Sequence, residues 1–134
     1  MQDWNKVFNS LADSGVYTVA SNRSVEALSG IADARGLDVS TIDLHGVMDK
    51  AGFLGEIASA LDFPSYFGMN WDALNECLAD LSWKQAEGYV LLFTGFQGFA
   101  EAAAKDAAIV VQILGVAANL WRERKVPFYA ILSA

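Results

Sequence analysis

Residues 63–81 read FPSYFGMNWDALNECLADL, and the rest of the chain can be arranged around them. Apolar side chains recur there at intervals of three and four residues, which places them on one stripe of an α-helix: Trp71, Leu74, Leu78 and Leu81. Asn70 is a typical N-cap residue, because its side-chain oxygen can accept a hydrogen bond from the first turn. The pattern therefore predicts a helix that begins after Asn70 and buries this stripe.

The opposite side of the predicted helix is acidic. Asp72, Glu76 and Asp80 stand four residues apart, Asn75 lies beside them, and residues 51–83 contain no Lys or Arg. Like charges at this spacing repel each other by a few tenths of a kcal/mol. The helix dipole favours Asp72 in the first turn but disfavours Asp80 in the last. Two interpretations remain open: a solvated helix face, or an anionic surface that meets a cationic partner.

Composition limits the class of protein. The chain has 134 residues, 54% of them hydrophobic, which predicts a single domain over residues 1–134 and excludes disorder. A net charge of −7 disfavours nucleic acid and anionic membranes as partners and favours a basic protein. Cys77 is the only cysteine, and the N-terminal residues lack the features of a signal peptide. No run of about eighteen apolar residues occurs. We therefore expect a cytoplasmic protein.

Four segments are typical of β-strands, being β-branched, aromatic or uninterruptedly apolar: 16–20 (VYTVA), 39–44 (VSTIDL), 89–93 (YVLLF) and 128–132 (FYAIL). Helical spacing occurs between them, in the first dozen residues, in 25–35 with Ser24 as cap and Gly36 as terminator, in 50–61 after the cap Asp49, and in 106–124. Residues 94–98 are typical of a turn. The alternation predicts an α/β fold with a parallel sheet of about four strands and helices on both faces.

Catalytic and cofactor patterns are weak in this sequence. Asp72 and Glu76 could form a hydrolase's carboxylate pair, but nothing on an exposed helix face separates their pKa values. Cys77 and His45 could form a nucleophile and base, although Cys77 falls on the buried side of its helix and His45 fits a plain turn. The segment Gly95–Gly98 lacks the spacing and the lysine of a phosphate-binding loop. We expect no enzyme, no cofactor and no metal site.

One longer sequence motif is specific enough to indicate a protein family. The pattern Pro64-x-Tyr66-Phe67-Gly68-x-Asn70-x-Asp72-Ala73-Leu74-x-x-Cys77-Leu78 resembles the barstar-like family of intracellular ribonuclease inhibitors. The resemblance implies a barstar-like core over residues 39–134. Residues 1–38 then form an N-terminal helix-strand-helix extension, which widens the sheet to four strands.

In the family, the helix and the loop before it plug the active site of a nuclease. Carried over to this chain, the resemblance implies eight contact residues: Tyr66, Phe67, Asn70, Trp71, Asp72, Asn75, Glu76 and Asp80. It also implies an immunity protein or antitoxin, without catalytic activity and monomeric when free, whose partner is a basic ribonuclease or nuclease toxin. Carboxylates at helical spacing suit a cleft built to hold phosphate. The alternative is a barstar-fold binding or regulatory module with no nuclease target.

The chain departs from the family pattern at positions that bear on the target. Asn75 stands where the pattern has a tryptophan, Glu76 replaces an aspartate, and Asp80 and Leu81 replace a glycine and a tryptophan. Leu120 stands where the last helix of the family contributes a glutamate. The resemblance therefore predicts the fold more firmly than the identity of the partner.

Overall fold

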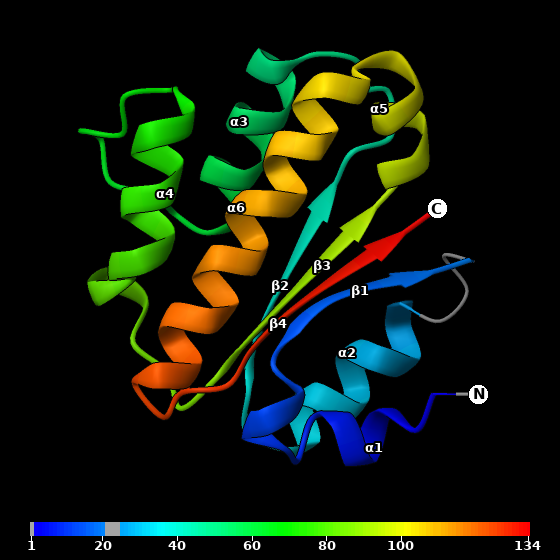
Figure 1. Cartoon of the computed structure of the whole chain (residues 1–134), viewed down its shortest axis with the longest axis vertical. Helices are drawn as coiled ribbons and strands as arrows, with labels where there is room; N and C mark the ends of the chain where they lie inside the picture. Colours follow the sequence, from blue (N-terminus) through cyan, green and yellow to red (C-terminus); the bar gives the residue numbers. More distant parts are fainter. Residues whose placement is uncertain (1, 21–24) are drawn as a thin grey trace.

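All four strands of the fold are parallel and form one sheet. The structure, a computed structural model, describes residues 2–20 and 25–134. Its sheet has the order β1-β4-β3-β2 (Figure 1). The strands are β1 (Gly15–Val19), β2 (Asp38–Asp43), β3 (Tyr89–Thr94) and β4 (Phe128–Ser133). The predicted parallel pairing of the last two strands is confirmed, with Tyr89 opposite Phe128.

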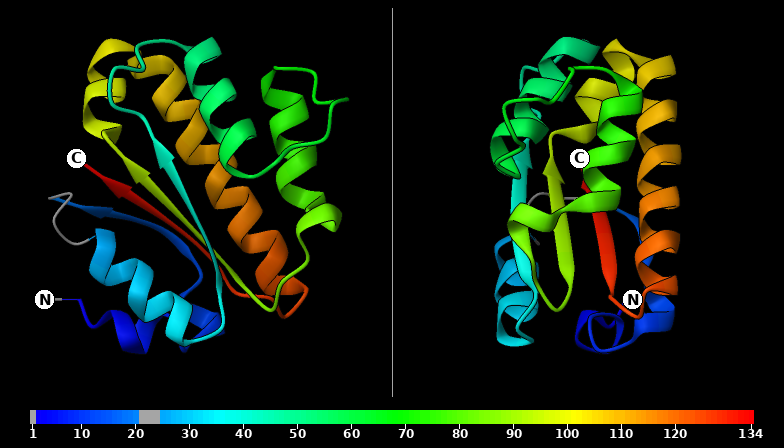
Figure 2. Two further views of the ribbon diagram at one scale, coloured as in Figure 1. Left: turned by 180° about the vertical axis from the view of Figure 1, so that it is seen from behind. Right: turned by 90° about the vertical axis from the view of Figure 1, so that its left-hand side faces the viewer.

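Helices cover both faces of the sheet (Figure 2). On one face lie α3 (Lys50–Ala60), α4 (Trp71–Asp80), α5 (Phe96–Ala102) and α6 (Ala104–Glu123); on the other lie α1 (Trp4–Val7) and α2 (Val25–Ala34). Alternate residues of β3 enter the two cores, with Leu91 and Phe93 facing α3 to α6 and Val90 and Leu92 facing α1 and α2. Because β3 and β4 are covered on both sides, their sequences are continuous apolar runs.

Several local predictions are confirmed. Asp49 caps α3 by accepting a hydrogen bond from the Gly52 amide at 2.8 Å. Gly36, with a φ of 77°, follows the end of α2 in the left-handed conformation that glycine tolerates. The predicted cap Ser24 lies outside the described residues.

Other helix and turn boundaries predicted from the sequence were wrong. Residues 94–98 are not only a turn, because Gly95 adopts a φ of 70° and α5 begins at the next residue. The N-terminal helix spans only Trp4–Val7 and is followed by a short 3-10 turn, Leu11–Asp13. The Ser10 carbonyl accepts hydrogen bonds from the Asp13 amide within the 3-10 turn at 3.1 Å and from the hydroxyl of Tyr129 in β4 at 2.7 Å. Leu81 is buried as expected, but it follows α4 in a left-handed conformation.

α6 is the longest helix that the structure describes. By length and composition alone it could cross a membrane. Seven of its side chains belong instead to the core, where the helix packs on α4, β1 and β4. We therefore interpret α6 as the central core helix of this face of the sheet.

Candidate protein-binding site

The N-terminus of α4 is fixed by its cap. Asn70 accepts a hydrogen bond from the Ala73 amide at 2.8 Å, and its own side-chain amide donates to the Gly68 carbonyl at 3.2 Å. Asn70 thus caps the first turn of α4 and also holds the loop that precedes the helix. Asp72 lies in the first turn, where its negative charge interacts favourably with the helix dipole.

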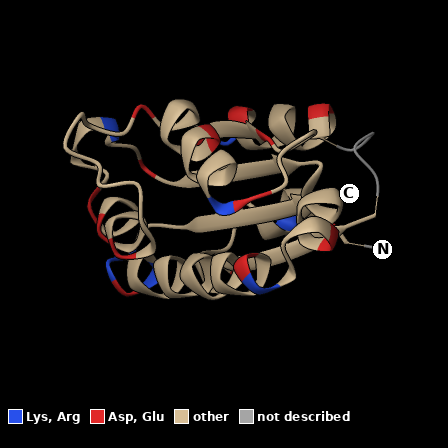
Figure 3. Ribbon diagram, turned by 90° about the horizontal axis from the view of Figure 1, so that it is seen from above, with Lys and Arg blue, Asp and Glu red and all other residues tan. Residues whose placement is uncertain are grey.

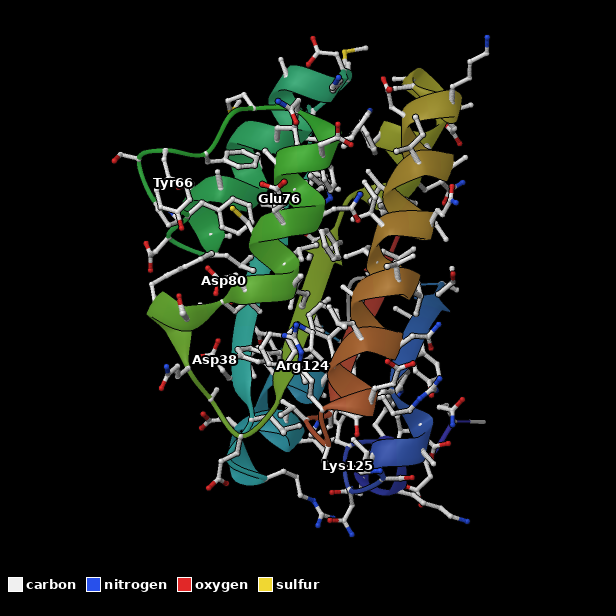
Figure 4. All side chains as sticks on the ribbon, turned by 60° about the vertical axis from the view of Figure 1, so that its left-hand side comes forward. Asp38, Tyr66, Glu76, Asp80, Arg124 and Lys125 are labelled. Atoms are coloured by element: carbon white, nitrogen blue, oxygen red, sulfur yellow. The ribbon has the colours of Figure 1, made fainter. Side chains whose placement is uncertain are left out.

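Three carboxylates are exposed along α4: Asp72, Glu76 and Asp80. No salt bridge that the structure records for the described residues involves any of them. At 3.6 residues per turn, each step of four residues advances about 40° around the helix. The three carboxylates therefore do not form a straight row along α4, and Figure 4 shows Glu76 and Asp80 on the side of α4 away from α6.

An aromatic cluster supports the loop that precedes α4. Phe63 packs edge-to-face against Phe67 at 4.9 Å and against Trp83 at 5.9 Å between ring centroids. The indole nitrogen of Trp83 donates to the Leu61 carbonyl at 3.0 Å, which ties the cluster to the end of α3. Tyr66 projects from this rigid base and is 73% exposed. Such an exposed aromatic on a fixed loop is suited to contact a partner.

A hollow of about 300 Å³ lies between this loop and α4. Six residues line it: Tyr66, Phe67, Ala73, Glu76, Cys77 and Asp80. The lining combines two carboxylates with an aromatic rim and an apolar floor. A cationic side chain could insert here, because its charged end would meet the carboxylates and its stem would contact the rings.

Cys77 forms part of the floor of the hollow and is 5% exposed. Burial raises the pKa of its thiol, and the nearby charges of Asp80 and Glu76 raise it further. A thiol with a raised pKa is a poor nucleophile at neutral pH. This agrees with the prediction that Cys77 acts as a small hydrophobic side chain.

His45 lies in a different hollow, of about 530 Å³, at the carboxyl ends of β2 and β3. Its ring nitrogen Nδ1 is 2.7 Å from the Asp43 carboxylate, and hydrogen bonds from His45 lower the pKa of Asp43. Cys77 and His45 therefore line separate hollows and do not form a nucleophile–base pair. Among the described residues, no group of His, Cys, Asp and Glu has the arrangement of a metal site.

Most of the chain matches one known protein family. A family model described as Barstar (barnase inhibitor) matches residues 37–133. The chain belongs to the barstar family. Residues 2–20 and 25–36, which supply α1, β1 and α2, lie outside the match. No curated protein matches the chain.

A solved structure shows that the fold is also found outside this family. The ORC2 protein of Aeropyrum pernix, solved in complexes with ADPNP and ADP, matches with a TM-score of 0.59 and 16% identity. The match covers 90% of this chain but 35% of that protein. At this identity the likeness establishes only that both contain a similar α/β arrangement.

The eight contact residues predicted from the sequence resemblance fall into two groups. Tyr66, Phe67, Glu76 and Asp80 are brought together around the hollow beside α4. The other four lie outside the hollow: Asn70, Trp71, Asp72 and Asn75. Asn70 is the helix cap. Asp72 and Asn75 are exposed.

Trp71 is half-buried, because its ring packs on Phe53 at 6.1 Å and lies under the Lys50 ammonium at 5.2 Å. The Trp71 side chain is thus partly buried in the core.

Two residues that hold the end of α4 could not be found from the sequence. The indole nitrogen of Trp121 donates to the Leu78 carbonyl at 2.7 Å, and the Arg124 guanidinium donates to the Ala79 carbonyl at 2.5 Å. The guanidinium also stacks over the Trp121 ring at 4.7 Å. These donors satisfy carbonyls in the last turn of a helix that has no basic residue of its own there. A cation at the end of α4 was not predicted, because it comes from more than 40 residues away in the sequence.

Proposed function

We propose that this chain is a cytoplasmic inhibitor of a basic ribonuclease, an immunity protein or antitoxin that blocks the nuclease cleft with α4 and the loop before it. The observation that carries the proposal is the exposed row of carboxylates on α4: Glu76 and Asp80 line the hollow, and none of the three has a recorded salt-bridge partner among the described residues. A ribonuclease cleft is positively charged to hold phosphate, so these carboxylates would replace the charge of the RNA.

Membership of the barstar family supports this proposal, because the family description is that of a barnase inhibitor. A net charge of −7 supports it too, since a chain of that charge repels nucleic acid and anionic membranes but attracts a basic protein. In the proposed mechanism the chain performs no chemistry. It binds without turnover and keeps RNA out of the cleft.

Inhibition of RNA cleavage tests the proposal. The chain would be titrated against barnase, the ribonuclease in the family description, and against any small basic nuclease encoded beside its own gene. We expect stoichiometric inhibition of at least one of them, with an association rate that falls steeply as salt rises from low to physiological concentration. If neither nuclease is inhibited at low salt, the alternative of a binding module without a nuclease target is favoured.

A further inference from the structure

Four non-glycine residues that the structure describes have a left-handed backbone conformation: Asp62, Met69, Leu81 and Lys125. Three of them lie within two residues of the C-terminal end of a helix, since α3, α4 and α6 end at Ala60, Asp80 and Glu123. A left-handed residue is a common way to end a helix. Met69 has a φ of 51° but does not follow a helix in this way, so its conformation needs another explanation.

Hydrogen bonds offset the cost of this conformation at the helix ends. After α3, the Phe63 amide donates to the Ala58 carbonyl at 2.9 Å. After α6, the Val126 amide donates to the Trp121 carbonyl at 2.9 Å. Each bond gives a partner to a carbonyl in the last turn of its helix. Met69 ends no helix and lies in the loop before α4, where no such gain explains its conformation.

Methionine is a strained choice at this position. The left-handed conformation crowds the Cβ atom of every residue except glycine, and asparagine tolerates it better than aliphatic side chains do. Gly68 is the preceding residue, but a Cβ atom there would lie 3.2 Å from the side-chain nitrogen of Asn70, which caps α4. Glycine at position 68 therefore makes room for the cap, and the left-handed conformation is left to Met69. Strain of this kind is concentrated at binding and active sites.

The strained residue is also an exposed apolar one. The Met69 side chain is 47% exposed, and Tyr66 on the same loop is 73% exposed. Residues 63–70 contain no charged side chain, whereas the charged residues of α4 are all acidic (Figure 3). The loop thus presents apolar side chains to solvent next to an anionic helix.

We propose that Met69 is a further contact residue of this site, where it packs on an apolar surface at the border of the nuclease's basic cleft. The inference rests on the proposed function, because it takes the ribonuclease as the partner. Carboxylates attract any basic protein, and salt screens that attraction. An apolar contact beside them adds affinity that salt does not screen and that only a matching surface provides. Methionine suits this role, because its flexible side chain adapts to the surface that it meets.

Met69→Asn tests the proposal, because asparagine tolerates the left-handed conformation and removes the apolar side chain without changing the charge. Its dissociation from barnase, or from the other ribonuclease that the parent inhibits, should be about tenfold faster. The association rate and its salt dependence should not change, because the carboxylates are intact. Met69→Leu keeps an apolar side chain and should dissociate as slowly as the parent. Met48→Asn is the matched control, because Met48 is 68% exposed but lines the separate hollow around His45.

Urea unfolding of the free chain supplies a second measurement that needs no nuclease. The midpoint of Met69→Asn should be no lower than that of the parent, because the substitution relieves strain in the loop. A lower midpoint would overturn the proposal, since the methionine would then serve the fold. Slow dissociation of Met69→Asn from a ribonuclease that the parent inhibits would also overturn it and would leave the inhibitor function intact. A parent that inhibits neither barnase nor the neighbouring nuclease would overturn both.

Discussion

Glu76 occupies the middle of the α4 carboxylate row and also lines the hollow, whereas Asp72 lies outside the hollow. A central charge is excluded from water most completely when a partner binds, so its loss leaves partner cations without a counter-ion. We expect Glu76→Ala to weaken binding to the inhibited ribonuclease by about 2–5 kcal/mol, mostly through faster dissociation. Asp80→Ala, nearer the end of α4, should cost less and act more on the association rate.

Stopped-flow association and dissociation rates measure both effects. Glu26→Ala removes the same charge from α2, on the other face of the sheet, and controls for net charge. Folding should survive both α4 changes, because each relieves repulsion between carboxylates. Unchanged binding by a folded Glu76→Ala variant would move the interface away from α4.

Glycine is required at position 95 by the backbone conformation there and by the close approach of neighbouring atoms. Its φ is 70°, and a Cβ atom there would lie 2.8 Å from the backbone nitrogen of His45. We expect Gly95→Ala to reduce the free energy of unfolding by more than the roughly 1–2 kcal/mol that the left-handed conformation costs an alanine. Gly98 is a matched control inside α5, because a Cβ atom there would meet no side chain beyond its chain neighbours within 4 Å; Gly98→Ala should be neutral or stabilising. Urea unfolding compares the two, and equal stability of both variants would contradict the close approach.

Among the elements, α4 depends on α6 for the partners of its last carbonyls. Trp121→Phe removes the indole donor to the buried Leu78 carbonyl and should cost about 1–3 kcal/mol, the usual penalty for an unsatisfied buried group. Arg124→Ala removes an exposed donor and should cost less. Hydrogen exchange at the Leu81 amide, which donates to Cys77 at the end of α4, should accelerate in both variants. Arg122→Ala, whose guanidinium bonds Asn119 within α6, should leave that exchange unchanged.

The elements also show what local sequence can and cannot predict. The Asn70 cap, the acidic row and the buried stripe of α4 each follow from residues within a few positions, and the structure has all of them. The support from Trp121 and Arg124 could not be predicted, because each donor lies more than 40 residues from its acceptor in the sequence. α5 was not predicted because Gly95 before its first residue and Gly98 within it are typical of a turn. The hollow likewise requires the loop and α4 to fold against each other.

At the scale of the whole molecule, the segment before the family match is built into the core. β1 pairs with the central strand β4, and Phe8 packs edge-to-face on Tyr129 at 5.1 Å. Tyr129 is fully buried and donates its hydroxyl to the Ser10 carbonyl. The segment thus covers a face of the sheet that would otherwise expose aromatic and aliphatic side chains to water. We infer that the N-terminal extension is a structural requirement of this chain.

Alkaline titration tests how firmly this segment is held. Burial raises the pKa of Tyr129 to about 12, and the negative charges of ionised Tyr17 and Asp13 add to the effect. The pKa of the phenol in the unfolded chain is near 10. Folding therefore holds the proton more tightly than the unfolded chain does. The resulting stability is complete below pH 10 and is lost as the pH rises toward 12.

We expect the free energy of unfolding to fall between pH 10 and 12 by on the order of 2–3 kcal/mol more in the parent than in Tyr129→Phe. The phenylalanine variant keeps the packing on Phe8 but has no proton to lose at this position. It should be less stable than the parent at pH 8, because the hydrogen bond from the Tyr129 hydroxyl to the Ser10 carbonyl is lost. Urea unfolding at each pH supplies the free energies, and Tyr89 contributes equally to both chains. Parallel curves for the two proteins would show that folding does not raise the pKa of Tyr129.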